Sequence, residues 1–321
     1  MVGFEGHVVP DRIRDLAHAG VIAGVVLFAR NVASTAQWQA LIAQIDEVFV
    51  GLPPIVAIDQ EGGPVQRLKP PAIPEATVVP AMGTLALDAA GFEALGRAMG
   101  AELRALGINV DFAPVLDVHT NPDNPIIGSR AFGTTPEDVI TRGLAFARGL
   151  AASEITWCAK HFPGHGDTSL DSHLALPRLP HTIERLLAVE LAPFAAAARS
   201  APMIMTAHVV FEALDATRPA TLSAVVVPQI LRQRFGYDGV VVSDDLDMLA
   251  IRNHYDVVEV AKGLAAADVD VPLVCHDLDF ALALAALLPR SEAAERRVRK
   301  LRESLARPRC SALPAFPSGL V

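Results

Sequence analysis

Residues 135–161 read TPEDVITRGLAFARGLAASEITWCAKH, and this stretch contains the unit whose repetition predicts the fold. Thr135 followed by Pro136 and two acids is typical of a helix start, because it combines an N-cap, a proline in the first turn and negative charge near the helix N-terminus. The helix is predicted to run to about residue 152 and to lead into an apolar strand over 155–160.

The same alternation of a short β-branched run and a longer helical pattern covers the chain. Continuously apolar strands that alternate with helices indicate a buried parallel sheet. Eight such units favour a closed barrel, and a barrel of this type takes about 250 residues. We therefore predict an α/β fold in which residues 1–321 form a single (β/α)8 barrel domain. The predicted strands are 2–4, 24–28, 54–58, 109–114, 155–160, 203–208, 239–243 and 269–275.

Several of these strands end abruptly in polar residues. Asp59, the pair Lys160-His161, His208 and the pair Ser243-Asp244 each follow an apolar run directly. In a parallel barrel the carboxyl ends of the strands meet at one mouth and carry the chemistry. These residues are therefore predicted to converge on one site.

Composition and charge indicate which binding partners and which cellular compartment to expect. The net charge is −9, and the basic run near the C-terminus is interleaved with acids in a helical pattern, which indicates a solvated helix face; no nucleic-acid partner is expected. The longest apolar runs, such as 21–29, are too short to span a bilayer, and no leader pattern opens the sequence, so no membrane association is expected. Cys158 and Cys275 are interpreted as small buried hydrophobic residues, and the expected location is the reducing cytoplasm.

The segment KHFPGHGDTSLDSH, residues 160–173, places three histidines and two aspartates in a loop that leaves a strand. Long loops inside compact domains are usually functional. A metal site on His161, His165 and His173 is one alternative, but Pro163 and Gly164 argue against the helix that would align the first two. No metal is expected, and His165 alone is equally well explained by a structural hydrogen bond.

Asp171 and His173 are interpreted as a catalytic dyad. A carboxylate two residues from an imidazole can accept a hydrogen bond from one ring nitrogen, which leaves the other nitrogen for proton transfer. The carboxylate also favours the imidazolium form, so that His173 can act as an acid near neutral pH.

The segment VVVSDDLDM, residues 240–248, places three acids directly after an apolar strand. Asp245 or Asp247 would suit an N-cap of the next helix. Asp244 should still point into the barrel mouth, where a carboxylate can attack the anomeric carbon of a sugar and form a glycosyl ester.

The segment DQEGGPVQR, residues 59–67, again follows a strand. Asp59 and Arg67 suit the binding of several sugar hydroxyls, and the paired glycines allow the backbone to approach a ligand closely. A salt bridge between Asp59 and Arg67 is the structural alternative. Arg130, in a glycine-flanked loop, supplies a further cation.

Taken together, these residues resemble glycoside hydrolase family 3, and within it the single-domain bacterial β-N-acetylhexosaminidases of peptidoglycan recycling. The likeness extends over nearly the whole chain. Its most specific motif is KHFPGHGDTSLDSH, followed by AIDQEGGPVQRL, DFAPVLDV and VVSDDLDM.

The resemblance implies a retaining β-N-acetylglucosaminidase with Asp244 as nucleophile, His173 as general acid/base and Asp171 as the partner of that histidine. It implies that the sugar ring is bound by Asp59, Arg67, Arg130, Lys160 and His161. The substrate would be a small glycan containing N-acetylglucosamine, with no cofactor, and a monomer is expected. Family members that act on glucose take their acid from a further C-terminal domain; this chain ends soon after the eighth unit, so the loop dyad is the candidate acid.

Two residues depart from the family pattern. Pro64 stands where arginine is common, and Asp247 stands where serine is usual, which adds negative charge near the proposed nucleophile. Both bear on the leaving group more than on the reaction. The rival functions are a phosphorylase, in which phosphate replaces water, a sugar-binding protein without turnover, and a metal-dependent hydrolase.

Overall fold

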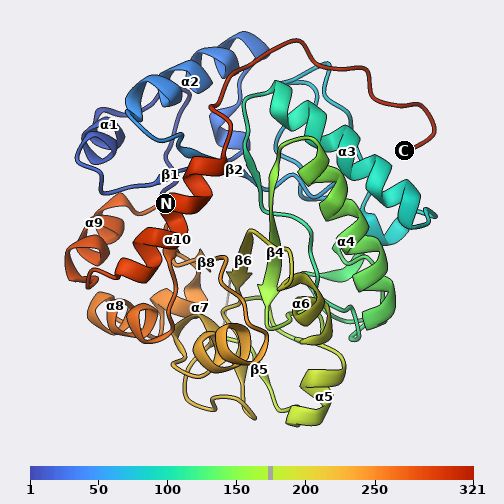
Figure 1. Ribbon diagram of the computed structural model, residues 1–321, viewed down its shortest axis with the longest axis vertical. Helices are drawn as coiled ribbons and strands as arrows, with labels where there is room; N and C mark the ends of the chain where they lie inside the picture. The colour runs from blue at the N-terminus through green and yellow to red at the C-terminus, as the bar shows by residue number, and fades with distance from the viewer. Residues whose placement is uncertain (173–175) are drawn as a thin grey trace.

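The computed structural model describes residues 1–172 and 176–321, and its centre is a parallel sheet that curls into a barrel (Figure 1). The hydrogen-bonded order is β1-β2-β3-β4-β6-β8-β9, with every neighbouring pair parallel. The strands are β1 (Gly24–Leu27), β2 (Ile55–Ile58), β3 (Val110–Asp111), β4 (Thr156–Phe162), β6 (Met203–Thr206), β8 (Val240–Asp245) and β9 (Val271–Leu273).

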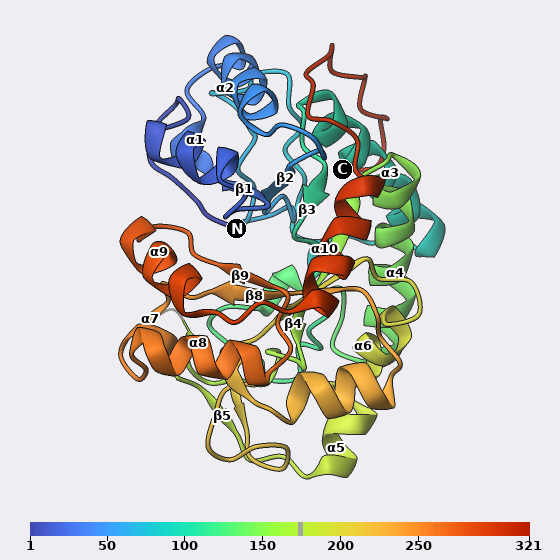
Figure 2. The ribbon, with the colours of Figure 1, turned by 60° about the vertical axis from the view of Figure 1, so that its left-hand side comes forward.

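Val2 closes the barrel between its first and last strands. It forms parallel bridges with both Val25 and Val274, and Figure 2 shows the N-terminus between β1 and β9. The amide of Val26 donates to the Val2 carbonyl at 3.0 Å, and the amide of Gly3 donates to the Val274 carbonyl at 2.9 Å. The predicted first strand is thus shortened to a bridge, but it fills the eighth position, and the predicted (β/α)8 barrel is confirmed.

Helices cover the outside of the barrel (Figures 1 and 2). Most of the longer helices begin with a polar side chain that accepts the amide hydrogen of a first-turn residue, as the motif at Thr135 predicts. The helices are α1 (Asp11–His18), α2 (Thr35–Val48), α3 (Ala89–Ala105), α4 (Pro136–Ala152), α5 (Ile183–Ala188), α6 (Ala192–Ala197), α7 (Leu249–Arg252), α8 (Val257–Ala266), α9 (Leu278–Leu287) and α10 (Glu292–Ser304).

Short segments complete the chain. A π-helical segment, η5 (Val226–Arg234), precedes β8, and β5 (Arg178–Leu179) pairs in parallel with β7 (Val210–Phe211) outside the barrel. Single 3₁₀ turns are η1 (Ala29–Asn31), η2 (Met82–Thr84), η3 (Gly128–Arg130) and η4 (Ala220–Leu222).

Two short helices, α5 and α6, follow one another with a break over residues 189–191. Pro193 lies in the first turn of α6, where its missing amide hydrogen costs nothing. The intervening Glu190 is buried and turns its carboxylate toward Arg185, with Nη2 to Oε1 at 2.9 Å. The break therefore places a buried acid beside the loop that follows β4.

Helix α10 closes the amino end of the barrel. Its Leu301 and Leu305 pack in the interior cluster with residues that open the strands, such as Ile55, Met203 and Val240. The prediction of a solvated basic face is wrong for Arg297, which is 8% exposed and pairs with Asp268 and Asp270. The three cysteines are free, and Cys158 and Cys275 are buried as expected.

No helix in residues 1–172 or 176–321 is both long enough and apolar enough to cross a bilayer.

Candidate active site

A cavity of about 230 Å³ lies at the carboxyl ends of the barrel strands. Four of the predicted strand-end residues line it: Asp59 after β2, Lys160 and His161 in β4, and Asp244 in β8. Arg67 and Arg130 also line it. The volume is below the range of about 300–1,000 Å³ typical of pockets for drug-sized ligands, and it suits a single sugar ring.

His208 does not line this cavity, contrary to the prediction. It follows β6 in the sequence and is fully buried; Nδ1 lies 2.8 Å from Thr221 Oγ1 and Nε2 lies 2.9 Å from the Asp245 carbonyl oxygen. A histidine with both ring nitrogens bonded to the protein supports neighbouring elements and is not presented to a ligand.

Glu61 links two of the predicted cations and was not singled out from the sequence. Its carboxylate accepts from Arg130 Nε at 2.8 Å and from Nη2 at 2.9 Å, which is a bidentate pair. Lys160 Nζ lies 2.5 Å from Glu61 Oε1 and 2.6 Å from Asp59 Oδ1. Burial opposes ionisation of Glu61, but the two cations outweigh it, so that its pKa lies below the usual value.

Lys160 is held in its charged form by the same contacts. Burial alone would lower its pKa, but Asp59 and Glu61 together raise it above the usual value. Asp111, fully buried nearby, has a pKa well above the usual value because of desolvation. The charges of Lys160, Asp59 and Glu61, which line the cavity, are therefore paired before any ligand enters.

Arg67 has one N–H group that is available to a ligand. Its Nη2 lies 3.5 Å from Asp59 Oδ2, so the ion pair considered as the structural alternative does form. Its Nε is buried and has no acceptor among the described residues. A buried N–H without an acceptor is costly, and a sugar hydroxyl in the cavity can supply one.

Asp117 organises both histidines at the start of the loop after β4, and it too was not singled out as a site residue. It is fully buried, and its carboxylate accepts from the amides of His161 and His165, with the His165 amide at 2.6 Å. His161 Nδ1 lies 2.7 Å from Asp117 Oδ2, which orients the ring, and His161 lines the cavity. Burial opposes the charge of Asp117, but His161 outweighs it and lowers the pKa.

His165 is a structural residue. Nδ1 lies 2.7 Å from Thr168 Oγ1 and Nε2 lies 3.0 Å from Ser172 Oγ, so both nitrogens are bonded to hydroxyls of its own loop. Burial lowers its pKa to about 4, which keeps the ring neutral at neutral pH. These bonds disfavour the alternative of a metal site on His161, His165 and His173.

The loop after β4 is fixed by the segment that follows β3. Asn124 Nδ2 donates to the His165 carbonyl at 2.9 Å, and Thr120 Oγ1 donates to Asp167 Oδ1 at 2.7 Å. A Cβ on Gly166 would lie 1.8 Å from the Val118 carbonyl oxygen, so only glycine allows this approach.

Asp244 is half-buried near the end of β8 and lines the cavity. Its Oδ1 accepts from the amide of Asp245 at 2.8 Å. The helix-cap alternative for its neighbours is wrong, because Met248 occupies the N-cap of α7. Asp245 and Asp247 instead accept amide hydrogens of the loop after β9, from Cys275 at 3.0 Å and His276 at 2.7 Å. Burial raises the pKa of Asp245 to about 6.

Of the predicted dyad, Asp171 lies among the described residues and His173 does not. Asp171 is half-buried at the end of the described loop, and the adjacent Ser172 lines the cavity. His173 lies outside the described residues.

The departures from the family pattern lie off the cavity wall. Pro64 is exposed, whereas the next residue, Val65, lines the cavity. The carboxylate of Asp247 accepts hydrogen bonds from the amides of His276 and Asp277. Glu61 and Asp117 lie inside the motifs AIDQEGGPVQRL and DFAPVLDV, and this position was the only sequence signal for them, because their burial is visible only in the structure.

A closed parallel barrel with acids and paired cations at the carboxyl ends of its strands has the architecture of a (β/α)8-barrel enzyme. Residues 2–307 match the model of the glycosyl hydrolase family 3 N terminal domain. The chain belongs to this family.

Three similar proteins illustrate the relationship. Beta-hexosaminidase A of Pseudoalteromonas piscicida is 38% identical over 284 residues, which are 83% of this chain and 48% of that protein. The family 3 β-N-acetylglucosaminidase of Paenibacillus sp. str. FPU-7 superposes with a TM-score of 0.88 at 40% identity, covering 99% of this chain and 63% of its own. NagZ of Neisseria gonorrhoeae, in complex with N-trifluoroacetyl-D-glucosamine, gives a TM-score of 0.84 at 32% identity, covering 95% of this chain and 90% of its own. The chain thus spans about half the length of the first relative and under two thirds of the second.

Proposed function

We propose that this chain is a retaining β-N-acetylglucosaminidase that removes terminal β-linked N-acetylglucosamine from peptidoglycan fragments or related glycans, with residues 1–321 acting as one catalytic domain. The observation that carries the proposal is the position of Asp244 near the end of β8, in a cavity of the size of a sugar ring. Lys160 and Arg130, each paired with a carboxylate, line the same cavity. A carboxylate in that position can attack the anomeric carbon of a bound ring.

The sugar assignment is supported by the relatives. The Paenibacillus structure is of a β-N-acetylglucosaminidase, and the Neisseria structure holds a glucosamine derivative acylated on nitrogen. Identities of 40% and 32% over nearly the whole of this chain support the transfer of that sugar class to the cavity described here.

The ring-binding residues divide by the kind of contact that they offer. Asp59 accepts hydrogen bonds, and its carboxylate is already oriented by Lys160 and Arg67. Arg67 offers the buried Nε that has no acceptor among the described residues. Arg130 and Lys160 are held by Glu61, and His161 is oriented by Asp117. Because these groups are ordered in advance, less conformational entropy is lost when a sugar binds.

In the first step the Asp244 carboxylate attacks the anomeric carbon. The bond from that carbon to the leaving oxygen breaks, and protonated His173 gives its proton to that oxygen. The products are a glycosyl ester on Asp244, the released alcohol and a neutral His173.

In the second step neutral His173 takes a proton from water, and the water oxygen attacks the same carbon. The ester bond to Asp244 breaks, which releases β-N-acetylglucosamine with retained configuration and restores both residues. Asp171 stabilises the charged form of His173 and fixes its tautomer.

The test compares nitrophenyl N-acetyl-β-glucosaminide with the matching β-glucoside, with and without phosphate, and identifies the sugar product. Free N-acetylglucosamine from the first substrate alone, at every phosphate concentration, is the expected result. A sugar phosphate would instead make the protein a phosphorylase, and binding of N-acetylglucosamine without turnover of either substrate would make it a sugar-binding protein.

A further inference from the structure

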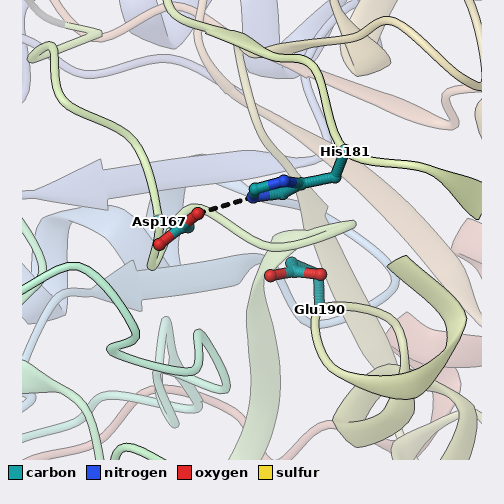
Figure 3. Close-up of side chains that lie close together, drawn as sticks. All are labelled: Asp167, His181 and Glu190. Atoms are coloured by element: carbon teal, nitrogen blue, oxygen red, sulfur yellow. Dashed lines mark hydrogen bonds and ion pairs between the residues drawn. The ribbon is translucent and has the colours of Figure 1, made fainter. Parts of the chain in front are cut away.

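A second group of polar side chains lies outside the cavity and has no part in the proposed reaction. Asp167, His181 and Glu190 each offer one ligand atom, and these three atoms lie within 4.8 Å of one another. Figure 3 shows the Glu190 carboxylate beside the hydrogen-bonded Asp167 and His181, whose Oδ2 and Nε2 are 2.5 Å apart. Among the described residues this is the one group of its kind.

Only Asp167 lies in the segment for which the sequence suggested a metal site, and that hypothesis named other residues as ligands. Asp167 belongs to the loop after β4, His181 precedes the N-cap of α5, and Glu190 lies between α5 and α6. Gly164 packs against Glu190, because a Cβ on this glycine would be 2.9 Å from the Glu190 Cβ. The group therefore sits where the loop after β4 rests on α5 and α6.

Glu190 provides an independent indication of a ligand. Its side chain is 2% exposed, and its Oε1 accepts from Arg185 Nη2 at 2.9 Å. Its Oε2 is buried and has no donor among the described residues. A buried carboxylate oxygen without a partner is costly, whereas coordination to a cation would satisfy it.

The local charge also favours a cation. The group contains two carboxylates: Glu190 pairs with Arg185, whereas Asp167 pairs with His181 and forms no ion pair with an arginine or lysine among the described residues. The imidazole of His181 is a nitrogen ligand when it is neutral, and it already contacts Asp167 through Nε2.

We propose that Asp167, His181 and Glu190 bind one divalent transition-metal ion of the zinc class. One imidazole nitrogen and two carboxylate oxygens, with water in the remaining position, form a common zinc ligand set. Zinc–ligand distances of about 2.0–2.2 Å place neighbouring ligands roughly 3.4 Å apart in a tetrahedral site. Zinc binding therefore replaces the hydrogen bond between His181 and Asp167 and brings the Glu190 carboxylate closer to these two side chains.

The bound ion would join the loop after β4 to α5 and α6. This loop carries Asp171 and leads to His173, so the ion would hold the segment that presents the proposed acid. The metal proposal does not depend on the proposed function, and it is tested by binding alone.

The experiment titrates Zn²⁺ into chelator-treated full-length protein and follows the heat of binding. The test variants are His181→Gln and Glu190→Gln, which keep polar side chains of similar size. The matched control is His254→Gln, an exposed histidine outside the group. His173→Gln is included to detect zinc binding at the proposed acid.

We expect one ion per chain in the wild type, His254→Gln and His173→Gln, and at least about tenfold weaker binding in His181→Gln and Glu190→Gln. Circular dichroism without metal checks that each variant is folded. Co²⁺ in place of zinc should give a visible spectrum without a thiolate band, because no cysteine is among the ligands. Unchanged zinc affinity in both folded test variants, or loss of binding in His173→Gln alone, would overturn the proposal.

Discussion

The charged residues at the strand ends neutralise one another before a substrate arrives. Lys160 contacts both Asp59 and Glu61, and Glu61 also holds Arg130 in a bidentate pair. Because these side chains are buried and bonded to one another, they keep a fixed geometry. A binding site needs such fixed side chains to place a sugar precisely. Asp244 stands among them as the carboxylate for which we propose covalent chemistry.

Asp244→Asn is expected to lower kcat by about 10⁴-fold or more, because an amide oxygen is a far weaker nucleophile than a carboxylate. Steady-state hydrolysis of nitrophenyl N-acetyl-β-glucosaminide measures the change. Asp238→Asn, at an exposed position just before β8, is the matched control and should retain activity. Activity of the Asp244 variant near that of the wild type would remove this residue as the nucleophile.

His173→Gln should reduce turnover of sugar leaving groups by about 10²–10⁴-fold and that of nitrophenyl leaving groups by much less. The difference is expected because a nitrophenolate departs without protonation, whereas a sugar alkoxide needs a proton. The measurement is kcat/KM for both substrate types. Equal losses on the two would show that His173 is not the general acid.

At the scale of the element, the loop after β4 depends on close backbone contact. Gly166 lies against the Val118 carbonyl, while Asn124 and Thr120 hold its neighbours. His165 adds bonds inside the loop through both ring nitrogens. The loop is therefore a supported element whose shape is set by the segment after β3.

Gly166→Ala is expected to destabilise the protein by about 1–3 kcal/mol, because its methyl group must displace the Val118 backbone. The same displacement should lower activity by moving the loop that leads to the proposed acid. Urea unfolding and hydrolysis rates measure the two effects. Ser169→Ala, at an exposed position of the same loop, should change neither; an unaffected Gly166→Ala would contradict the close contact.

At the scale of the whole molecule, the barrel is closed both around its circumference and at its amino end. Val2 joins β1 to the segment after β9, and α10 covers the opening with Leu301 and Leu305. Apolar residues from many strands meet in this interior, so that damage at one point affects the stability of the whole domain.

Leu301→Ala should lower the free energy of unfolding by about 2–5 kcal/mol, because it leaves a cavity beneath the barrel interior. The neighbouring exposed Lys300→Ala should change it by no more than about 0.5 kcal/mol. Thermal and urea unfolding compare the pair. Equal stability of both variants would show that α10 does not seal the barrel.

Glu61 should make the stability of the whole domain sensitive to acid. Its folded pKa lies below the ordinary value of 4.5, so its contribution is present above that pH and is lost as the pH falls below it. At neutral pH the free energy of unfolding of Glu61→Gln should be about 3–5 kcal/mol lower than that of the wild type, because Arg130 and Lys160 lose a buried charged partner.

The difference in the free energy of unfolding between the wild type and Glu61→Gln should therefore decrease as the pH falls from about 7 to about 3. Urea unfolding across this range measures it. A difference that stays constant with pH would mean that Glu61 is not held ionised by its two partners.

The sequence by itself determined the features that depend on near neighbours along the chain. The helix start at Thr135 was predictable because a cap involves residues three apart. The eight-unit barrel was predictable from alternating periods, and the meeting of Asp59, Lys160 and Asp244 followed because parallel strands end at one mouth.

Only the tertiary structure decided which polar residues pair with which. Glu61 and Arg130 are 69 residues apart, and nothing local distinguishes that acid from Asp59. The same holds for His165 and His208, which proved to be buried structural residues, and for Glu190, which the break between α5 and α6 turned inward. The physical reason is that burial and pairing depend on what the folded chain brings within about 3 Å, and a residue's own neighbours in the sequence do not contain that information.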